Sequence, residues 1–207
     1  MIPEHSKKDD VYLLNVAKIG NSIENIVYLE NVLSKDEHET ILNFVNSYEK
    51  WKIEPWQARS ILYDKIPRHI LEMLHKVFSI AYEKSTDLYD VKLDPLDDKY
   101  RFNLLKFMPE FYLEPHIDTQ SVESNHIASV YYINDDYEGG EIVFPDYNLN
   151  IKPKANSLIV FPGNENYMHK VTKIVDKNRY SSSKWFQFTG SEFNKINEWY
   201  SHLKYKA

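Results

Sequence analysis

The stretch EIVFPDYNLNIKPKANSLIVFP, residues 141–162, contains three short apolar segments separated by turn residues. Asp146 and Pro153 mark the two breaks. The pattern predicts three short strands, over 141–145, 149–152 and 157–162. The same alternation continues on both sides and predicts further strands over 101–108, 127–133, 168–174 and 180–189. Many short antiparallel strands in succession are typical of a β-sandwich or barrel.

The first half of the chain shows helical spacing. A short strand is predicted over 26–30, and Ser34 with Glu37 then forms a capping-box pattern that starts a helix over 35–49. Pro67 is a favoured first-turn residue and begins a second helix. Both helices carry an apolar stripe, which we interpret as core packing.

These segments predict one α+β domain over residues 1–207. Residues 1–99 form the N-terminal strand and helical support, residues 100–190 form the β core, and residues 191–207 contain a short C-terminal helix. We expect the N-terminal helices to pack on one sheet of the core.

The composition limits the possible functions. The formal net charge is -6, and an acidic chain is a poor binder of phosphate backbones, so a nucleic-acid partner is not expected. The chain contains no cysteine, which excludes disulfides, cysteine–zinc sites and thiol catalysis. It also has no signal-peptide pattern and no apolar run of membrane-spanning length. We therefore expect a cytoplasmic protein without a membrane segment; the oligomeric state cannot be read from the sequence.

Three residues suggest a metal site. His116 and Asp118 form the His-x-Asp pair of Glu114-Pro115-His116-Ile117-Asp118, and residues i and i+2 of a strand point to the same side. His169 follows 53 residues later, at the start of another predicted strand. Two imidazoles and one carboxylate form the facial set that holds Fe(II) and leaves coordination positions open. Taken alone, the His-x-Asp pair is more often a surface ion pair.

Two residues further along strengthen this interpretation. Arg179 lies ten residues after His169, so a strand pair can return it to the same cavity. A planar guanidinium binds a carboxylate through two parallel hydrogen bonds. Ser181 lies on the same strand face and can donate another.

These residues lie within a longer segment that resembles a known family. The segment from Phe107 to Phe186 resembles the prolyl 4-hydroxylase-like branch of the 2-oxoglutarate/Fe(II) dioxygenases. Five motifs carry the likeness in order and spacing: Phe107 to Asp118, Ser129 to Asn134, Gly139-Gly140-Glu141 to Pro145, Ala155 to Phe161, and His169 through Arg179 to Phe186.

The resemblance implies a double-stranded β-helix, or jelly roll, made of two antiparallel sheets. It implies that His116, Asp118 and His169 hold Fe(II) and are the catalytic residues. Arg179 would then bind the distal carboxylate of the co-substrate 2-oxoglutarate, with Tyr132 and Ser181 as further contacts. The reaction would consume O2, and ascorbate is a possible reductant.

The resemblance further implies hydroxylation of an unactivated C–H bond, with release of succinate and CO2. The leading substrate is a prolyl residue of a peptide or protein. Four alternatives stay open: a free amino acid or small-molecule metabolite as substrate, base demethylation, a non-catalytic binding module, and a cupin-like isomerase or metal-binding module. Base demethylation is disfavoured because such relatives carry a second Arg where this chain has Trp185.

Two departures from the family pattern concern the site. Members often carry Tyr at Phe107, where the phenol can contact the cofactor, so that hydrogen bond is lost or comes from elsewhere; Asn103 is a neighbouring polar candidate. Members also often carry Gly at Glu110, so we expect the turn before the metal-site strand to differ. For the substrate, residues 119–125 are expected at the rim. Trp185 and residues 51–63 are candidates for apolar walls, although aromatic residues of a β core usually pack within the core.

Overall fold

The computed structural model describes residues 7–8, 11–19, 22–89, 92–94, 102–118 and 126–187. The predicted C-terminal helix and the predicted rim segment 119–125 lie outside the described residues. Within the described part, no helix is long and apolar enough to cross a membrane.

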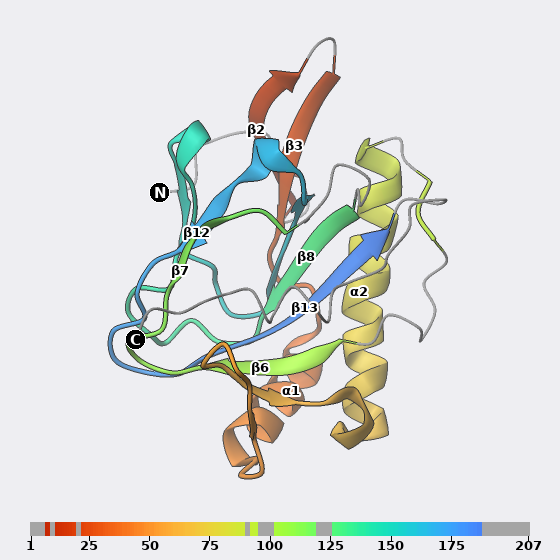
Figure 1. The fold of residues 1–207 in the computed structure, drawn as a ribbon. Helices are drawn as coiled ribbons and strands as arrows, with labels where there is room; N and C mark the ends of the chain where they lie inside the picture. The colour runs from red at the N-terminus through yellow and green to blue at the C-terminus, as the bar shows by residue number, and fades with distance from the viewer. Residues whose placement is uncertain are drawn as a thin grey trace.

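The strands form two antiparallel sheets (Figure 1). The larger sheet has nine strands in the spatial order β1 (Lys7–Lys8), β2 (Val11–Ile19), β3 (Ser22–Leu29), β11 (Ser157–Pro162), β8 (His126–Tyr132), β13 (Arg179–Gln187), β6 (Asn103–Phe107), β5 (Arg59–Ile61) and β4 (Lys52–Ile53). The smaller sheet has the order β10 (Leu149–Ile151), β9 (Ile142–Phe144), β12 (His169–Val171) and β7 (Leu113–His116). This arrangement is the expected double-stranded β-helix.

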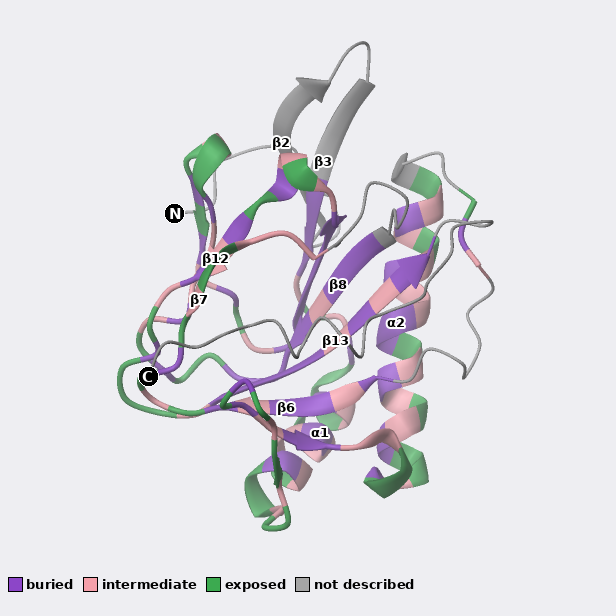
Figure 2. Cartoon of the chain, in the orientation of Figure 1, coloured by how far each residue is buried: buried purple, intermediate pink, exposed green. Residues whose placement is uncertain are grey.

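Two helices cover the outer face of the larger sheet, as predicted. α1 (Lys35–Ser47) and α2 (Arg68–Tyr89) lie behind β6, β8 and β13, whereas β7 and β12 lie on the opposite side (Figure 1). Their apolar stripes form one buried cluster with residues of the sheet, including Ile41, Ile70, Leu74, Phe78, Tyr131 and Leu158. Figure 2 shows the same stripe as the buried face of α2.

A second apolar cluster fills the space between the two sheets. All six residues of β11 are buried, and the side chains from Leu158 to Phe161 belong alternately to the two clusters. Leu158 and Val160 face the helices, whereas Ile159 and Phe161 pack between the sheets. A strand covered on both faces reads as a continuous apolar run, which explains the sequence Leu158 to Phe161.

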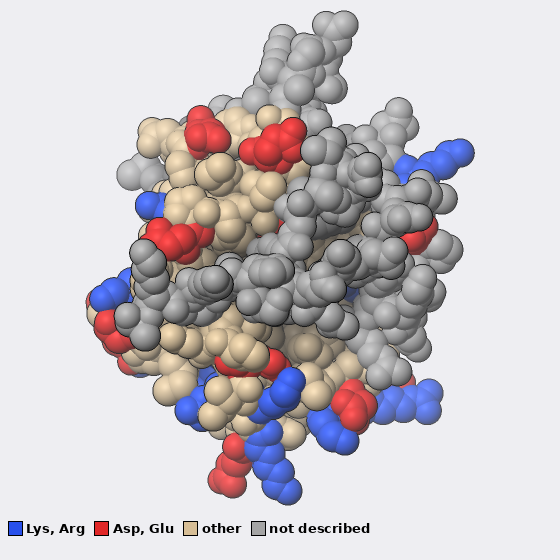
Figure 3. Space-filling view, in the orientation of Figure 1, with Lys and Arg blue, Asp and Glu red and all other residues tan. Residues whose placement is uncertain are grey.

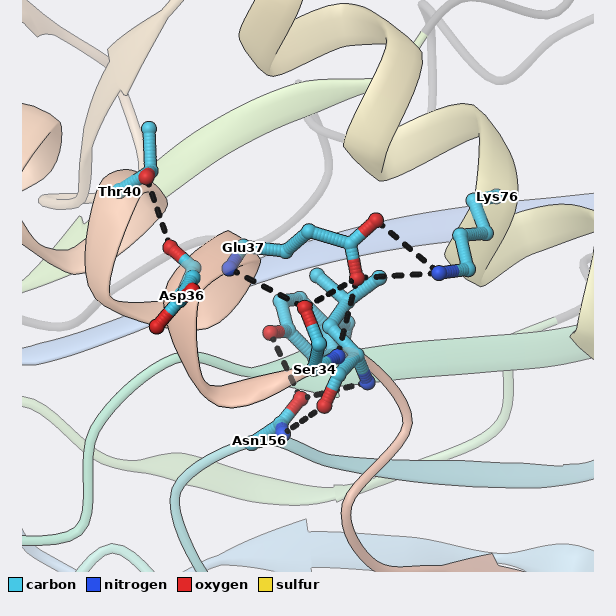
Figure 4. A network of polar contacts seen from close by, with 8 residues as sticks. Ser34, Asp36, Glu37, Thr40, Lys76 and Asn156 are labelled. Atoms are coloured by element: carbon cyan, nitrogen blue, oxygen red, sulfur yellow. Dashed lines mark hydrogen bonds and ion pairs between the residues drawn. The ribbon is translucent and has the colours of Figure 1, made fainter.

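The start of α1 is anchored to the sheet by a polar network (Figure 4). Ser34 and Glu37 form the predicted capping box, and the Glu37 carboxylate also accepts from Lys76 Nζ of α2 at 3.0 Å. Asn156 Oδ1 accepts from Leu33 N at 3.0 Å, and Asn156 Nδ2 donates to Leu33 O at 2.8 Å. The helix therefore enters at a fixed position relative to β11.

Seven predicted core strands and the strand over 26–30 are present, most of them shorter than expected. The helix from Pro67 is also confirmed, with its first helical residue at Arg68. The sequence did not predict β1, β2, β4 and β5, and it implied β7 only through the His-x-Asp motif. β4 and β5 contain only two and three residues, too few for a period-two pattern to show. Short connecting 3-10 turns cover Tyr63–Lys65, Pro145–Tyr147 and Glu165–Tyr167.

Candidate metal and co-substrate site

The three predicted metal ligands come together at the edge between β7 and β12. His116 ends β7, His169 starts β12, and the two are paired directly across the strands. Asp118 Oδ1 lies 4.0 Å from His116 Nε2 and 3.9 Å from His169 Nε2. One ligand atom from each residue lies within 4.8 Å of the others, so a single ion could contact all three. The pairing of β7 and β12 thus brings together two histidines that are 53 residues apart in the sequence.

Backbone carbonyls orient both imidazoles. His116 Nδ1 lies 2.7 Å from Glu114 O, and His169 Nδ1 lies 3.0 Å from Tyr167 O. Because a carbonyl oxygen only accepts, each Nδ1 carries the proton, and in the neutral tautomer Nε2 is the nitrogen with the lone pair. Both lone pairs are therefore available on the side of Asp118, as metal ligation requires.

Burial keeps His169 neutral. The ring packs against Phe161 and Phe144, with centroid separations of 4.9 and 5.6 Å. Loss of solvent lowers the pKa of His169 to about 4, although the Asp118 carboxylate opposes this shift. The residue therefore offers an unprotonated nitrogen at neutral pH.

The three predicted co-substrate residues lie deeper, on two neighbouring strands. Arg179 and Ser181 lie two positions apart on one face of β13, and Tyr132 of β8 is the direct partner of Ser181. All three are buried, with exposures of 3, 1 and 1%. Burial raises the pKa of Tyr132, so its phenol stays protonated and can donate a hydrogen bond.

Only some of the polar atoms of Arg179 and Ser181 form hydrogen bonds within the described part of the chain. Arg179 Nη1 donates to Gly140 O at 3.1 Å, but Arg179 Nε and Ser181 Oγ have no hydrogen-bond partner among the described residues. No ion pair between Arg179 and a carboxylate is found in the same residues. Buried polar groups without partners are rare in folded proteins and indicate a place where a ligand binds.

One pocket contains all six predicted residues. It is lined by His116, Asp118, His169, Arg179, Tyr132 and Ser181, together with Trp56, Leu105, Phe107, Leu113, Val130, Ile142, Val171, Ser183 and Trp185. Trp56 and Trp185 confirm part of the expected apolar wall. By contrast, Trp51 stacks on Tyr180, a residue of the helix-side core cluster.

The apolar lining residues Val130 and Val171 were not predicted from the sequence. Each lies two positions from a predicted site residue, Val130 before Tyr132 and Val171 after His169. The two-residue period of a strand places such neighbours on the same face. That period is the signal that could have identified them.

The glycine pair before β9 has a steric role. Gly139 and Gly140 both have positive φ, +70 and +67°. A Cβ on Gly139 would lie 1.8 Å from Lys173 O, so only glycine fits there. This turn brings the Gly140 carbonyl to Arg179 Nη1.

The two departures have structural answers. Asn103 does not line the pocket, because its side-chain oxygen accepts from Tyr63 N at 3.2 Å. Phe107 does line it and lies over the Arg179 guanidinium. Glu110 has φ 71°, so this turn keeps the left-handed conformation that favours glycine, although a glutamate occupies it.

The donor set fits the cofactors that the family implies. Two imidazole nitrogens and one carboxylate suit Fe(II), and the Arg179 Nε without a partner among the described residues, with the Ser181 hydroxyl, suits a carboxylate ligand. Both groups open into the same pocket.

Comparisons with known proteins agree with this geometry. Residues 102–187 match the family model described as the 2OG-Fe(II) oxygenase superfamily, where 2OG is 2-oxoglutarate. The β core of the chain matches that of a 2OG-Fe(II) oxygenase. The matched residues run from β6 to β13 and include every predicted site residue. None of the curated protein sequences matches the chain.

Solved structures of prolyl hydroxylases share the fold of this chain. A prolyl-4-hydroxylase from Pseudomonas putida has 13% identity and a TM-score of 0.66, with 81% of this chain and 94% of that chain covered. The viral collagen prolyl hydroxylase of Paramecium Bursaria Chlorella virus-1, in complex with 2OG, has 17% identity and a TM-score of 0.59, with coverage of 79 and 95%. A Trichoplax adhaerens prolyl hydroxylase has 14% identity and a TM-score of 0.61, with coverage of 79 and 83%.

Proposed function

We propose that this protein hydroxylates a prolyl residue of a polypeptide, consuming O2 and 2OG and releasing succinate and CO2. The observation that carries the proposal is one pocket in which a His-Asp-His set adjoins a buried arginine without a carboxylate partner. The first group would hold Fe(II), and the second would hold the co-substrate.

His116, Asp118 and His169 would bind the iron from one side. When bound, Fe(II) with 2OG supplies the oxidising power that activates O2 toward a C–H bond. The chain itself supplies geometry, because the carbonyls of Glu114 and Tyr167 hold both imidazole rings in the ligating tautomer.

Arg179 would form the charge-assisted pair with the distal carboxylate of 2OG, through its unpartnered Nε edge. Ser181 Oγ lies two residues along the same strand face and would donate a second hydrogen bond. The protonated Tyr132 phenol would add a third. The surrounding apolar side chains would keep water from these contacts.

The pocket lining favours a segment of a polypeptide over a free amino acid. A free amino acid carries an ammonium and a carboxylate, and each needs a partner when buried. Among the described lining residues, the carboxylate of Asp118 is assigned to the metal and the cation of Arg179 to 2OG. The remaining walls include Trp56, Leu113 and Trp185, which suit an uncharged, apolar ring such as that of proline.

The structures of similar fold support a peptide substrate. The Trichoplax prolyl hydroxylase was solved in complex with a peptide fragment of the hypoxia inducible factor oxygen degradation domain. A nucleic-acid substrate is disfavoured by the net charge of -6. On the face in Figure 3, Lys and Arg side chains lie mostly toward the lower edge, among acidic side chains, and form no continuous basic groove.

The first test is an anaerobic titration of the metal-free protein with Fe(II), then with 2OG, followed by its visible spectrum. We expect a weak charge-transfer band that needs both additions. The band should disappear in His169→Ala, and Arg179→Ala should require much more 2OG. His69→Ala and Arg68→Ala are matched controls, because both side chains are exposed on α2, and they should titrate like the wild type.

Substrate is tested next, by succinate release with proline-containing peptides and with free amino acids. We expect release coupled to a peptide that gains one oxygen. Iron binding without a band would refute the co-substrate assignment and favour a metal-binding module. Coupled turnover with a free amino acid, but not with any peptide, would refute the polypeptide substrate.

A further inference from the structure

The guanidinium of Arg179 lies over an aromatic ring. Its Cζ lies 4.5 Å from the centroid of Phe107 and 5.7 Å from that of Tyr132. The residue is 3% exposed, and Nη1 donates a hydrogen bond to Gly140 O at 3.1 Å. In the part of the chain that the structure describes, the Gly140 carbonyl and the ring of Phe107 thus both offset the buried charge.

The strand register places Phe107 there. Phe107 of β6 is the direct partner of Arg179 of β13, and the sheet holds the two side chains on the same face. Two other rings hold Phe107 from behind, Phe111 at 4.6 Å and Trp56 at 5.7 Å between centroids. Phe107 is 4% exposed, so the packed rings leave it little room to turn away.

A phenyl ring attracts a guanidinium without a hydrogen-bonding atom of its own. The negative face of the ring attracts the cation, and the ring carries no oxygen or nitrogen that would accept from the N–H groups. Phe107 therefore stabilises the charge without occupying the donors that a carboxylate ligand needs. It also restricts the guanidinium plane, so that less freedom is lost when a ligand binds.

We propose that Phe107 is a positioning residue that sets the affinity for the distal carboxylate of the co-substrate through its cation–π contact with Arg179. The inference rests on the proposed function, in which Arg179 binds that carboxylate. It gives a role to the position where similar proteins often carry Tyr: in this chain the ring acts through the arginine and not through a phenol hydrogen bond.

The test uses the whole protein loaded with Mn(II), which permits binding measurements without turnover. Calorimetric titrations compare 2OG with 2-oxobutyrate, a 2-oxo acid that lacks the distal carboxylate. We expect F107L to weaken 2OG binding about tenfold, the effect of a desolvated cation–π contact. Binding of 2-oxobutyrate should stay within about twofold of the wild type. F107Y keeps an aromatic face and should recover most of the affinity for 2OG.

Two further variants show where the effect arises. In an R179M background, F107L should cause no additional loss of 2OG affinity, because the partner of the ring is absent. F78L is a matched core control, since Phe78 is fully buried in the helix-side cluster, away from the pocket. It should leave the affinities for both acids unchanged.

The outcomes separate the inference from the proposed function. If F107L weakened the binding of both acids equally, or did not weaken the binding of 2OG, the role of Phe107 would be overturned. The co-substrate assignment would still stand if R179M lost affinity for 2OG. Unchanged 2OG affinity in R179M itself would overturn the co-substrate assignment, and the inference with it. Selective loss of 2OG in F107L, absent in the R179M background, would support both.

Discussion

Replacing Arg179 with methionine should make the ligand-free protein more stable, although it removes a proposed binding residue. The guanidinium is 3% exposed, and its Nε has no hydrogen-bond partner among the described residues. A buried donor without a partner costs about 1–3 kcal/mol, and burial of the charge adds to this. Methionine fills a similar volume without a charge.

Two contacts oppose this gain. The bond from Arg179 to Gly140 O and the cation–π contact with Phe107 are lost, and together they contribute roughly 3–4 kcal/mol. The unpartnered donor and the several kcal/mol needed to desolvate the charge together exceed this contribution. The net expectation is an increase of about 1–2 kcal/mol in the free energy of unfolding. Saturating ligand should reverse the order, because 2OG at about one hundred times its dissociation constant stabilises the wild type alone by about 2.7 kcal/mol.

The assay is urea denaturation of the wild type and R179M, with Mn(II) and with or without 2OG. R68M is the control, because Arg68 is exposed and its replacement should change stability by less than about 0.5 kcal/mol. A loss of stability in ligand-free R179M would refute the reasoning. It would show that the arginine supports the fold and is not held ready for a ligand.

Three further predictions concern the scaffold. The contacts with Lys76 and Ser34 lower the pKa of Glu37 to about 2, so its stabilisation is present above pH 4.5 and lost as the pH falls toward 2. E37Q should therefore lose about 1 kcal/mol at pH 7, after allowance for solvent screening, and much less at pH 3; an equal difference in denaturation at both values would contradict this. Glu110 has a positive φ, which glycine adopts without strain and alanine does not. In thermal denaturation, the E110G variant should therefore be more stable than the E110A variant by about 1 kcal/mol. Equal melting temperatures of the two variants would argue against backbone strain at this position. G139A should destabilise by at least about 3 kcal/mol in urea denaturation, since its Cβ would overlap Lys173 O, and a smaller loss would mean that the turn can shift.

Much of the site could be predicted from the order of the residues. The residue types of His116, Asp118 and His169 indicate metal ligation, and that of Arg179 indicates carboxylate binding. Strand alternation places residues i and i+2 on the same face of a strand. The capping box at Ser34 and the apolar run from Leu158 to Phe161 likewise follow from local rules. Such features depend on a few neighbouring residues, which is why the sequence by itself determined them.

Only the tertiary structure decided how distant segments meet. The register that pairs Arg179 with Phe107, and His169 with His116, depends on which strands become neighbours. The cation–π contact of Phe107, the missing partner of Arg179 Nε and the wall formed by Trp56 all follow from that choice. No local propensity encodes them, because the packing of the whole core selects the strand order and the register.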